Sequence, residues 1–225
     1  MKIKLFLFAA GFTLALVFAL SCSFGDGGDK ENNIGKYRIV VIGTQTWMAE
    51  NLNYAVAGSK CYGDLDSNCD IYGRLYNWAT AMGFESSCNS RSCSSQINSP
   101  HRGICPAGWH IPSSEDWGKL SRYVDGTSGM FAGYASSTAG RYLKATSGWN
   151  NNGNGTDEFE FSALPGGVGS PDGSFSNVGI IGSWWSTSES GGNDAYYRGM
   201  DYDGESAIWD DSSESFLRSV RCLQD

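Results

Sequence analysis

Cysteine spacing constrains the fold of this chain more than any other feature of its sequence. The chain has seven cysteines, and all but one follow residue 60, as Cys61, Cys69, Cys88, Cys93, Cys105 and Cys222. In an oxidising compartment these six residues can form three disulfides, in several possible pairings. The short separations favour Cys61–Cys69 and Cys88–Cys93, which leaves Cys105–Cys222 as a long-range bridge. Free thiols are the alternative.

The first 22 residues have the pattern of an export signal. Lys2 and Lys4 form a positive start, and an apolar run follows from Leu5 to Leu20. This run is shorter than the roughly 20 residues of a membrane-spanning helix and fits the hydrophobic region of a signal peptide. We therefore predict a signal peptide over residues 1–22.

The signal ends in a segment that resembles a bacterial lipobox, whose cysteine is lipidated and becomes the new N-terminus. The segment reads Ala19-Leu20-Ser21-Cys22, and its first two residues depart from those usual at these positions. We expect Cys22 to carry a lipid anchor, as the only attachment to a membrane. The chain would then be an exported cell-envelope protein, an outer-membrane lipoprotein. The alternative is an ordinary signal peptide in which Cys22 has no such role.

Composition separates a linker from one folded domain. Residues 23–33, SFGDGGDKENN, are too polar and glycine-rich to pack, and we predict a flexible linker there and a single domain over residues 34–225. With 13% aromatic residues, 8 of them Trp, the chain is not of the disordered class. The formal net charge is −8 and no cluster of Lys and Arg is present, so nucleic acid is excluded as a partner.

Two main helices are predicted from apolar spacing. Residues 72–83 place apolar side chains on one helical face and end at a capping glycine, with the pattern Leu75, Trp78, Ala79, Met82 and Gly83. A second helix begins after Ser113, which forms a capping-box pattern with Asp116, and ends near Gly126. Its predicted buried stripe is Trp117, Leu120 and Val124. Residues 142–145 are a possible short helical turn.

The predicted strands are short and separated by polar turns. They are residues 36–48 as two strands around Gly43-Thr44, then 159–163, 181–188, 195–200, 206–209 and 216–223. The loops are predicted at 51–70, 85–102, 147–157 and 166–179. This order predicts an α+β fold, in which two main helices pack on small antiparallel sheets with long irregular disulfide-stapled loops.

Several long strings identify a family resemblance. They are IGTQTWMAENLNY, CYGDLDSNCDIYGRLYNWATAM, CPAGWHIPSSEDW, GWNNNGNGTDEFEFSALPGG, GSWWSTSE and SVRCL. Together they resemble the Fibrobacter succinogenes major paralogous domain, a family of exported bacterial proteins, from about Ile34 to the C-terminus. The family implies no established activity, so function has to be inferred from sites.

The resemblance also implies a fold. The family looks like a member of the C-type-lectin-like superfamily, which includes the formylglycine-generating enzyme fold. The segment from Gly108 to Trp117 matches the turn and helix of that fold, and Trp184-Trp185 and Arg221-Cys222 match its last strands. In that fold a cysteine near the second helix pairs with one near the C-terminus, which implies the bridge Cys105–Cys222.

The sequence gives little support for catalysis. His101 and His110 are the only histidines, and His110 is expected to be structural, with its ring bonded to local backbone. The formylglycine-generating branch needs a reactive cysteine pair near the C-terminus, whereas only Cys222 follows Cys105. Neighbouring carboxylates suggest a glycosidase as an alternative, but a solvated acidic surface explains them better: Glu158, Glu160, Asp201, Asp203, Glu205, Asp210 and Asp211. No catalytic residue is assigned.

An acidic segment is a candidate calcium site. Asp64, Asp66, Asn68 and Asp70 place oxygen ligands at every second residue, and hard cations prefer oxygen. The segment is not an EF-hand, because its sixth and twelfth positions are Cys69 and Leu75. A polar turn inside the Cys61–Cys69 loop explains it better, and residues 150–157 are a similar, weaker candidate. Calcium is therefore the one cofactor considered.

Aromatic residues of the second half are the other candidates for ligand binding. They are Trp149, Trp184, Trp185, Tyr202 and Trp209, in a region that also holds Tyr196 and Tyr197. Within one strand Trp184 and Trp185 point to opposite faces, so one could be core while the other is exposed. An exposed ring beside Asn and Asp side chains could bind the apolar face of a sugar, although all these rings could also be core.

These observations favour a non-catalytic binding module for polysaccharide or an envelope protein. An enzyme on the same scaffold, either a hydrolase or an oxidoreductase, and a purely structural envelope protein are the alternatives.

Overall fold

The structure described here is a computed structural model, and it covers residues 36–126 and 136–225. These residues belong to a compact unit that extends over Glu31–Asp225. The predicted signal peptide, Cys22 and the predicted linker over residues 23–33 lie outside the described residues. Within 36–126 and 136–225, no helix has both the length and the apolar composition needed to cross a bilayer.

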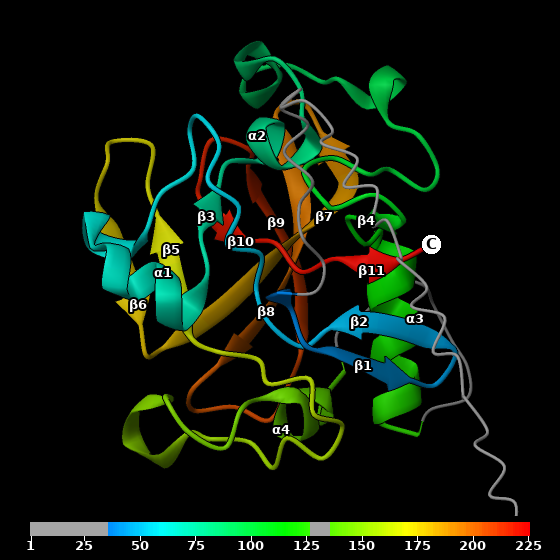
Figure 1. The fold of residues 1–225 in the computed structure, drawn as a ribbon, viewed down its shortest axis with the longest axis vertical. Coiled ribbons are helices and arrows are strands. Elements are labelled where there is room, and N and C mark those ends of the chain that lie inside the picture. Colours follow the sequence, from blue (N-terminus) through cyan, green and yellow to red (C-terminus); the bar gives the residue numbers. More distant parts are fainter. Residues whose placement is uncertain (1–35, 127–135) are drawn as a thin grey trace, which may run out of the picture. The chain divides into compact units, whose positions relative to one another are not determined.

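Two main sheets and a small hairpin form the framework (Figure 1). The first sheet has the order β1 (Ile39–Ile42), β2 (Gln45–Met48), β11 (Leu223–Gln224) and β4 (Trp109–His110). The second has the order β3 (Leu75–Tyr76), β10 (Arg218–Ser219), β7 (Ile181–Gly191), β8 (Asp194–Asp201) and β9 (Ile208–Ser213). The hairpin pairs β5 (Gly166–Gly169) with β6 (Phe175–Val178). Strands pair antiparallel, except that β10 and β7 are parallel.

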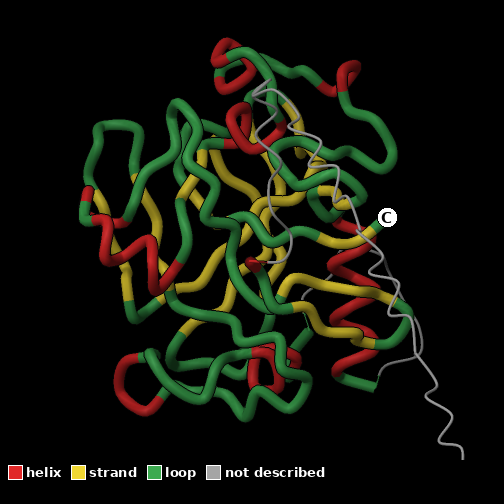
Figure 2. Tube along the Cα trace, viewed as in Figure 1, coloured by secondary structure: helices red, strands yellow, loops and turns green. Residues whose placement is uncertain are grey.

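The helices are short, and loops make up much of the backbone (Figure 2). The α-helices among the described residues are α1 (Asp66–Tyr72), α2 (Trp78–Met82), α3 (Ser114–Val124) and α4 (Ala139–Leu143). Single turns of 3₁₀-helix lie at Tyr62–Asp64, Ser86–Asn89, Ser94–Gln96 and Asn150–Asn152. The mixed fold of small sheets, few helices and stapled loops agrees with the predicted α+β class.

The predicted capping box of α3 is confirmed. The Ser113 side chain accepts a hydrogen bond from the Asp116 amide at 3.1 Å, and Asp116 accepts one from the Ser113 amide at 3.1 Å. These bonds satisfy amides that the first turn leaves free. The predicted stripe of Trp117, Leu120 and Val124 is buried.

The first predicted helix is shorter than its sequence pattern. Only Trp78–Met82 is helical, because Leu75–Tyr76 is strand β3, paired with β10. Asn77 caps α2 by accepting a bond from the Thr80 amide at 2.8 Å. Gly83 ends the helix with a φ of 71°, in the left-handed region that favours glycine. The second short helix, α4, begins ahead of the predicted turn at 142–145.

Four other predictions need correction. Residues 66–70, predicted as loop, are part of α1, and residues 166–178, also predicted as loop, form the β5–β6 hairpin. Residues 159–163 are not a strand, because Glu160 and Ser162 have φ values of 55° and 54°. The last predicted strand, 216–223, is divided between β10 and β11 in different sheets.

The three disulfides are those predicted. Cys61–Cys69, Cys88–Cys93 and Cys105–Cys222 have Cα–Cα distances of 5.0, 5.7 and 6.0 Å. These lie within the ordinary range for a disulfide. The last of them links the segment before β4 to the segment before β11, and so fixes the C-terminal strand to the middle of the chain.

The five-stranded sheet separates two hydrophobic clusters. Trp184 packs in one with Trp47, Trp117 and Phe161, and Trp185 packs in the other with residues such as Trp78. The two neighbours therefore point to opposite faces, as predicted, and both are completely buried. Both faces of β7 are covered, so neither ring reaches solvent.

Candidate functional site

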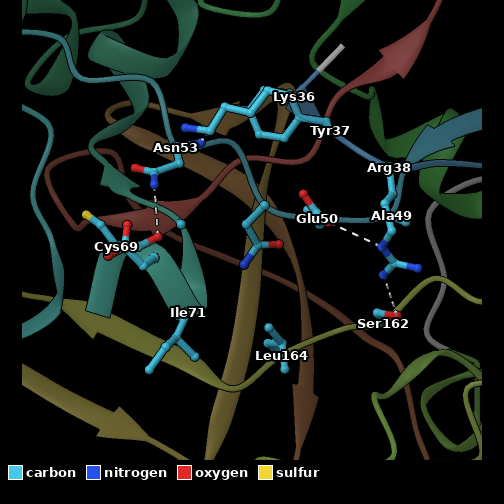
Figure 3. Close-up of a pocket in the computed structure, with 13 residues that line it drawn as sticks. Lys36, Tyr37, Arg38, Ala49, Glu50, Asn53, Cys69, Ile71, Ser162 and Leu164 are labelled. Atoms are coloured by element: carbon cyan, nitrogen blue, oxygen red, sulfur yellow. Dashed lines mark hydrogen bonds and ion pairs between the residues drawn. The ribbon is translucent and has the colours of Figure 1, made fainter. Parts of the chain in front are cut away.

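A pocket of about 300 Å³ lies where distant segments of the chain meet (Figure 3). Residues 36–38 precede β1, residues 49–53 follow β2, residues 69–73 belong to the end of α1, and Ser162 and Leu164 come from the loop before β5. Asn53 and Cys69 lie on one side in this view and Arg38 and Ser162 on the other. A volume of this size suits one small ligand.

Asn51 forms a rigid base for this pocket. It is only 6% exposed, and its Oδ1 accepts hydrogen bonds from Trp184 Nε1 at 2.7 Å and from Arg221 Nη2 at 2.7 Å. Its Nδ2 donates to the Tyr72 carbonyl at 2.8 Å and to Ser219 Oγ at 3.3 Å. The base therefore needs no reorganisation before a ligand binds, which lowers the cost of binding.

Tyr37 and Asn53 form one wall. The Asn53 amide N–H donates to the Tyr37 hydroxyl at 3.0 Å, and Asn53 Nδ2 donates to the Cys69 carbonyl at 3.0 Å. Burial raises the pKa of Tyr37 above its usual value and the charge of Glu50 adds to the rise, although the Asn53 hydrogen bond opposes it. The Tyr37 hydroxyl therefore keeps its proton at neutral pH and has it available to donate.

The opposite wall is an ion pair with a hydroxyl. Arg38 Nε lies 3.2 Å from Glu50 Oε1, and Arg38 Nη2 donates to Ser162 Oγ at 3.3 Å. Ser162 in turn donates to Asp157 Oδ2 at 2.7 Å. Two bonds hold the guanidinium in one orientation. Because Arg38 and Glu50 form an ion pair, their charges largely cancel.

A second candidate site is an aromatic pair at the edge of the five-stranded sheet. Tyr196 on β8 and Trp209 on β9 stack with ring centroids 4.3 Å apart and an interplanar angle of 21°. Both rings are partly exposed. Trp209 Nε1 lies 3.4 Å from Ser114 Oγ, and Ser190 donates to Asp211 at 2.8 Å nearby on β7 and β9. Hydroxyl and carboxylate groups thus surround the stacked rings.

The three other predicted tryptophans are not available to a ligand. Trp149 is 5% exposed and donates through Nε1 to the Ala163 carbonyl at 3.0 Å. Trp184 and Trp185 have no exposed surface. Tyr202 is partly buried against the hydrophobic cluster that contains Trp184. Of the predicted set, Trp209 alone belongs to the partly exposed aromatic pair. We withdraw the three buried tryptophans as sugar-binding residues, because none of them has an open ring face.

The acidic segment does not gather into a calcium loop. Residues from Asp66 onward form α1, where side chains two positions apart point to different sides of the helix. Asp64 instead pairs with Lys60 Nζ at 2.9 Å, and Asn68 donates to the Tyr62 carbonyl at 2.9 Å. No group of three or more His, Cys, Asp or Glu residues suited to a metal ion is found within 36–126 and 136–225. Of the four candidate calcium ligands, only Asp70 lines the pocket of Figure 3.

His110 has a different environment from the one predicted. Its Nδ1 lies 2.8 Å from Asp225 Oδ1 and its Nε2 lies 3.7 Å from Asp116 Oδ2, so its partners are carboxylates rather than backbone. Burial alone would lower the pKa of His110, but hydrogen bonds and charges of Asp116 and Asp225 outweigh it and raise the pKa above the usual value. The ring therefore joins β4 to α3 and to the residue after β11.

His101 is held by backbone groups at both ring nitrogens. Its Nδ1 accepts from the Asn98 amide at 3.1 Å, and its Nε2 lies 2.9 Å from the Met82 carbonyl, to which it donates. Both histidines line an open pocket of about 450 Å³ beside α3. The carboxylates weighed for a glycosidase, from Glu158 to Asp211, line neither this pocket nor the one in Figure 3.

The family can now be stated from a comparison. The model of the Fibrobacter succinogenes major domain matches residues 40–224. The chain belongs to this family. No curated protein and no solved structure matches the chain. Both candidate sites, the pocket and the aromatic pair, draw residues from inside the matched segment.

Sequence reasoning missed most of the pocket of this Fibrobacter succinogenes major domain. Tyr37, Asn53 and Ser162 come from three separate segments and carry no motif. The partner of Trp209, Tyr196, had a signal: in strands β8 and β9 the residue opposite Tyr196 is Asp211, two positions from Trp209. Such diagonal pairs lie within reach of long aromatic side chains, but the register has to be known first.

Proposed function

We propose that this protein is exported, lipid-anchored at the cell envelope through Cys22, and a non-catalytic binding module for polysaccharide. Export and anchoring are supported by the apolar run from Leu5 to Leu20 and by the lipobox-like segment that ends at Cys22. We also propose a C-type-lectin-like fold for the domain. This is supported by the Cys105–Cys222 bridge and by the position of α3 after the segment from Gly108.

The aromatic pair is the observation that carries the choice of ligand. A ring with an open face covers the apolar face of a sugar, and neighbouring hydroxyl and carboxylate groups bond to sugar hydroxyls. Tyr196 and Trp209 are stacked and partly exposed, and Ser190 and Asp211 lie on the neighbouring strand positions. Strands β8 and β9 hold both rings, so the platform is part of a sheet and not of a mobile loop.

The test is retention on polysaccharides. The compact unit, residues 31–225, would be passed over cellulose, xylan, pectin and peptidoglycan, each with calcium and with a chelator. We expect retention on at least one polymer, unchanged by chelator. Trp209→Ala should weaken it about tenfold, as expected for loss of one aromatic contact.

The matched control is Tyr123→Ala, which removes an aromatic side chain that is 57% exposed on α3. Retention should be unchanged in this variant. Equal retention of Trp209→Ala and the original protein would contradict the platform. No retention on any polymer would contradict the polysaccharide assignment and favour a protein partner or a structural role.

A further inference from the structure

We infer that the pocket of Figure 3 binds a small zwitterion of the amino-acid class, independently of the aromatic pair. The first support is charge. Four charged side chains line the pocket, and Arg38 and Glu50 neutralise one another at 3.2 Å. Lys36 and Asp70 remain, and within residues 36–126 and 136–225 neither has an ion-pair partner. A ligand with one ammonium and one carboxylate supplies both missing partners.

The second support is hydrogen bonding. Tyr37 accepts a bond from the Asn53 amide, which leaves its own proton free for an acceptor on the ligand. Asn53 uses its Nδ2 on the Cys69 carbonyl, which leaves its side-chain oxygen free for a donor. Asn53 and Asp70 both lie beside the end of α1, so the free acceptors are suited to an ammonium group. Lys36 and the Tyr37 hydroxyl are the donors suited to a carboxylate.

The third support is the apolar part of the lining. Ile71 and Leu164 line the lower part of the pocket in Figure 3, away from Lys36 and Tyr37. Ile71 is 57% exposed. An aliphatic side chain on the zwitterion would cover it. The volume of about 300 Å³ limits the ligand to a molecule of single amino-acid size.

The rigidity of the pocket makes such binding measurable. Asn51 is fixed by five hydrogen bonds: it accepts three from Trp184 and Arg221 and donates two, to Tyr72 and Ser219. The Cys61–Cys69 disulfide fixes α1. Binding therefore orders few side chains of the protein, which leaves more of the contact energy for affinity.

The experiment is titration calorimetry of the compact unit, residues 31–225, with three matched probes. The probes are leucine, leucinamide, which lacks the carboxylate, and N-acetylleucine, which lacks the ammonium. We expect leucine to bind at least tenfold more tightly than either analogue, because each analogue loses one charge-assisted hydrogen bond. Failure to bind leucine, or equal binding of all three probes, would overturn the inference.

Two variants assign the charges. Asp70→Asn should abolish the preference for leucine over N-acetylleucine, and Lys36→Gln should abolish the preference over leucinamide. Asp66→Asn, on the same helix but outside the lining, is the matched control for the carboxylate, and Lys60→Gln is the control for the ammonium. If the first two variants bind all probes as the original protein does, the inference is wrong.

The polysaccharide proposal is tested separately by the same set of proteins. Trp209→Ala should keep its leucine binding, because Trp209 does not line this pocket. Asp70→Asn should keep its retention on polysaccharide. Loss of both activities in one of these variants would contradict the independence of the two sites.

Discussion

Arg221 and Glu214 are both completely buried, yet their surroundings are opposite. Around Arg221 the fold supplies acceptors: Nη2 donates to Asn51 Oδ1 at 2.7 Å, and Nη1 donates to the Phe161 carbonyl. The Phe161 ring lies under the guanidinium, 4.3 Å from its central carbon. Around Glu214, neither carboxylate oxygen has a hydrogen-bond partner in the described residues.

The two environments explain the charge state of each group at neutral pH. Burial lowers the pKa of Arg221 to about 9, so at neutral pH it stays a cation bound by neutral dipoles and a ring. Burial, together with the charges of Glu189 and Asp194, raises the pKa of Glu214 to about 8, so at neutral pH it is a neutral acid. One buried ion is stabilised, and the other group avoids ionising.

Removing the stabilised ion should have the largest effect at a fixed pH. Arg221→Met leaves the Phe161 carbonyl without a donor in the core and leaves Asn51 Oδ1 with Trp184 Nε1 alone, so we expect unfolding to cost about 3 kcal/mol less. Denaturant unfolding of residues 31–225 measures this. Arg91→Met, at an exposed site, is the control and should change stability by less than about 0.5 kcal/mol. Similar midpoints for the two variants would contradict the role of Arg221.

Glu214→Gln should remove a pH dependence. The native pKa of about 8 lies above the ordinary 4.5, so between these values the unfolded chain releases a proton that the native protein keeps. Stability is therefore greatest below pH 4.5 for this group and falls as pH rises towards about 8, by up to about 1.4 kcal/mol per pH unit.

Thermal unfolding from pH 5 to 9 tests this, with Glu189→Gln as the matched carboxylate control. Glu214→Gln should flatten the decline in stability between about pH 5 and 8. In this range the unfolded chain has released the proton that native Glu214 keeps. The control should keep much of the decline, because Glu214 remains. A decline of unchanged slope in Glu214→Gln would mean that Glu214 is ionised in the native protein.

The His110 contact should have the smallest effect. Burial lowers the pKa of His110, but its two carboxylate partners raise it above the usual value. The contribution of His110 to stability is therefore present below pH 6.5 and is lost as pH rises through the native pKa. In a double-mutant cycle of His110→Gln and Asp225→Asn, we expect a coupling of about 1 kcal/mol at pH 5.5, because the Asp225 side chain is 48% exposed. A coupling as large at pH 8.5 would show that the contact does not depend on the charge of His110.

The sequence predicted those features whose signals are local. The capping box of α3 depends on Ser113 and Asp116, three residues apart, and the two short disulfides depend on near neighbours. The family resemblance implied the long disulfide. The strand predicted over residues 159–163 is wrong. Its alternating pattern reflects the burial of Phe161 and Ala163, but Glu160 and Ser162 have positive φ values and the segment is not extended. The β5–β6 hairpin was missed because its glycine-rich sequence resembles a loop.

The candidate sites were much harder to predict. Whether Trp184 or Trp185 is open depends on what covers each face of β7, which no strand pattern contains. Likewise, the sequence does not distinguish Asn51 from an ordinary loop residue, because its role depends on a hydrogen bond from Arg221, 170 positions away. The pocket above it exists only because four distant segments meet, and the residues that give it its charges, such as Lys36, carry no signal of their own.

The Cys105–Cys222 bridge has a mechanical consequence. It closes a covalent loop with a sequence separation of 117 residues, which contains β4, α3, α4 and strands β5 to β10. Tension applied at the two ends of the chain passes through the bridge, so the residues inside this loop cannot be extended while it is oxidised. The segment before Cys105, apart from its two short disulfide loops, and residues 223–225 lie outside this loop and can be pulled out.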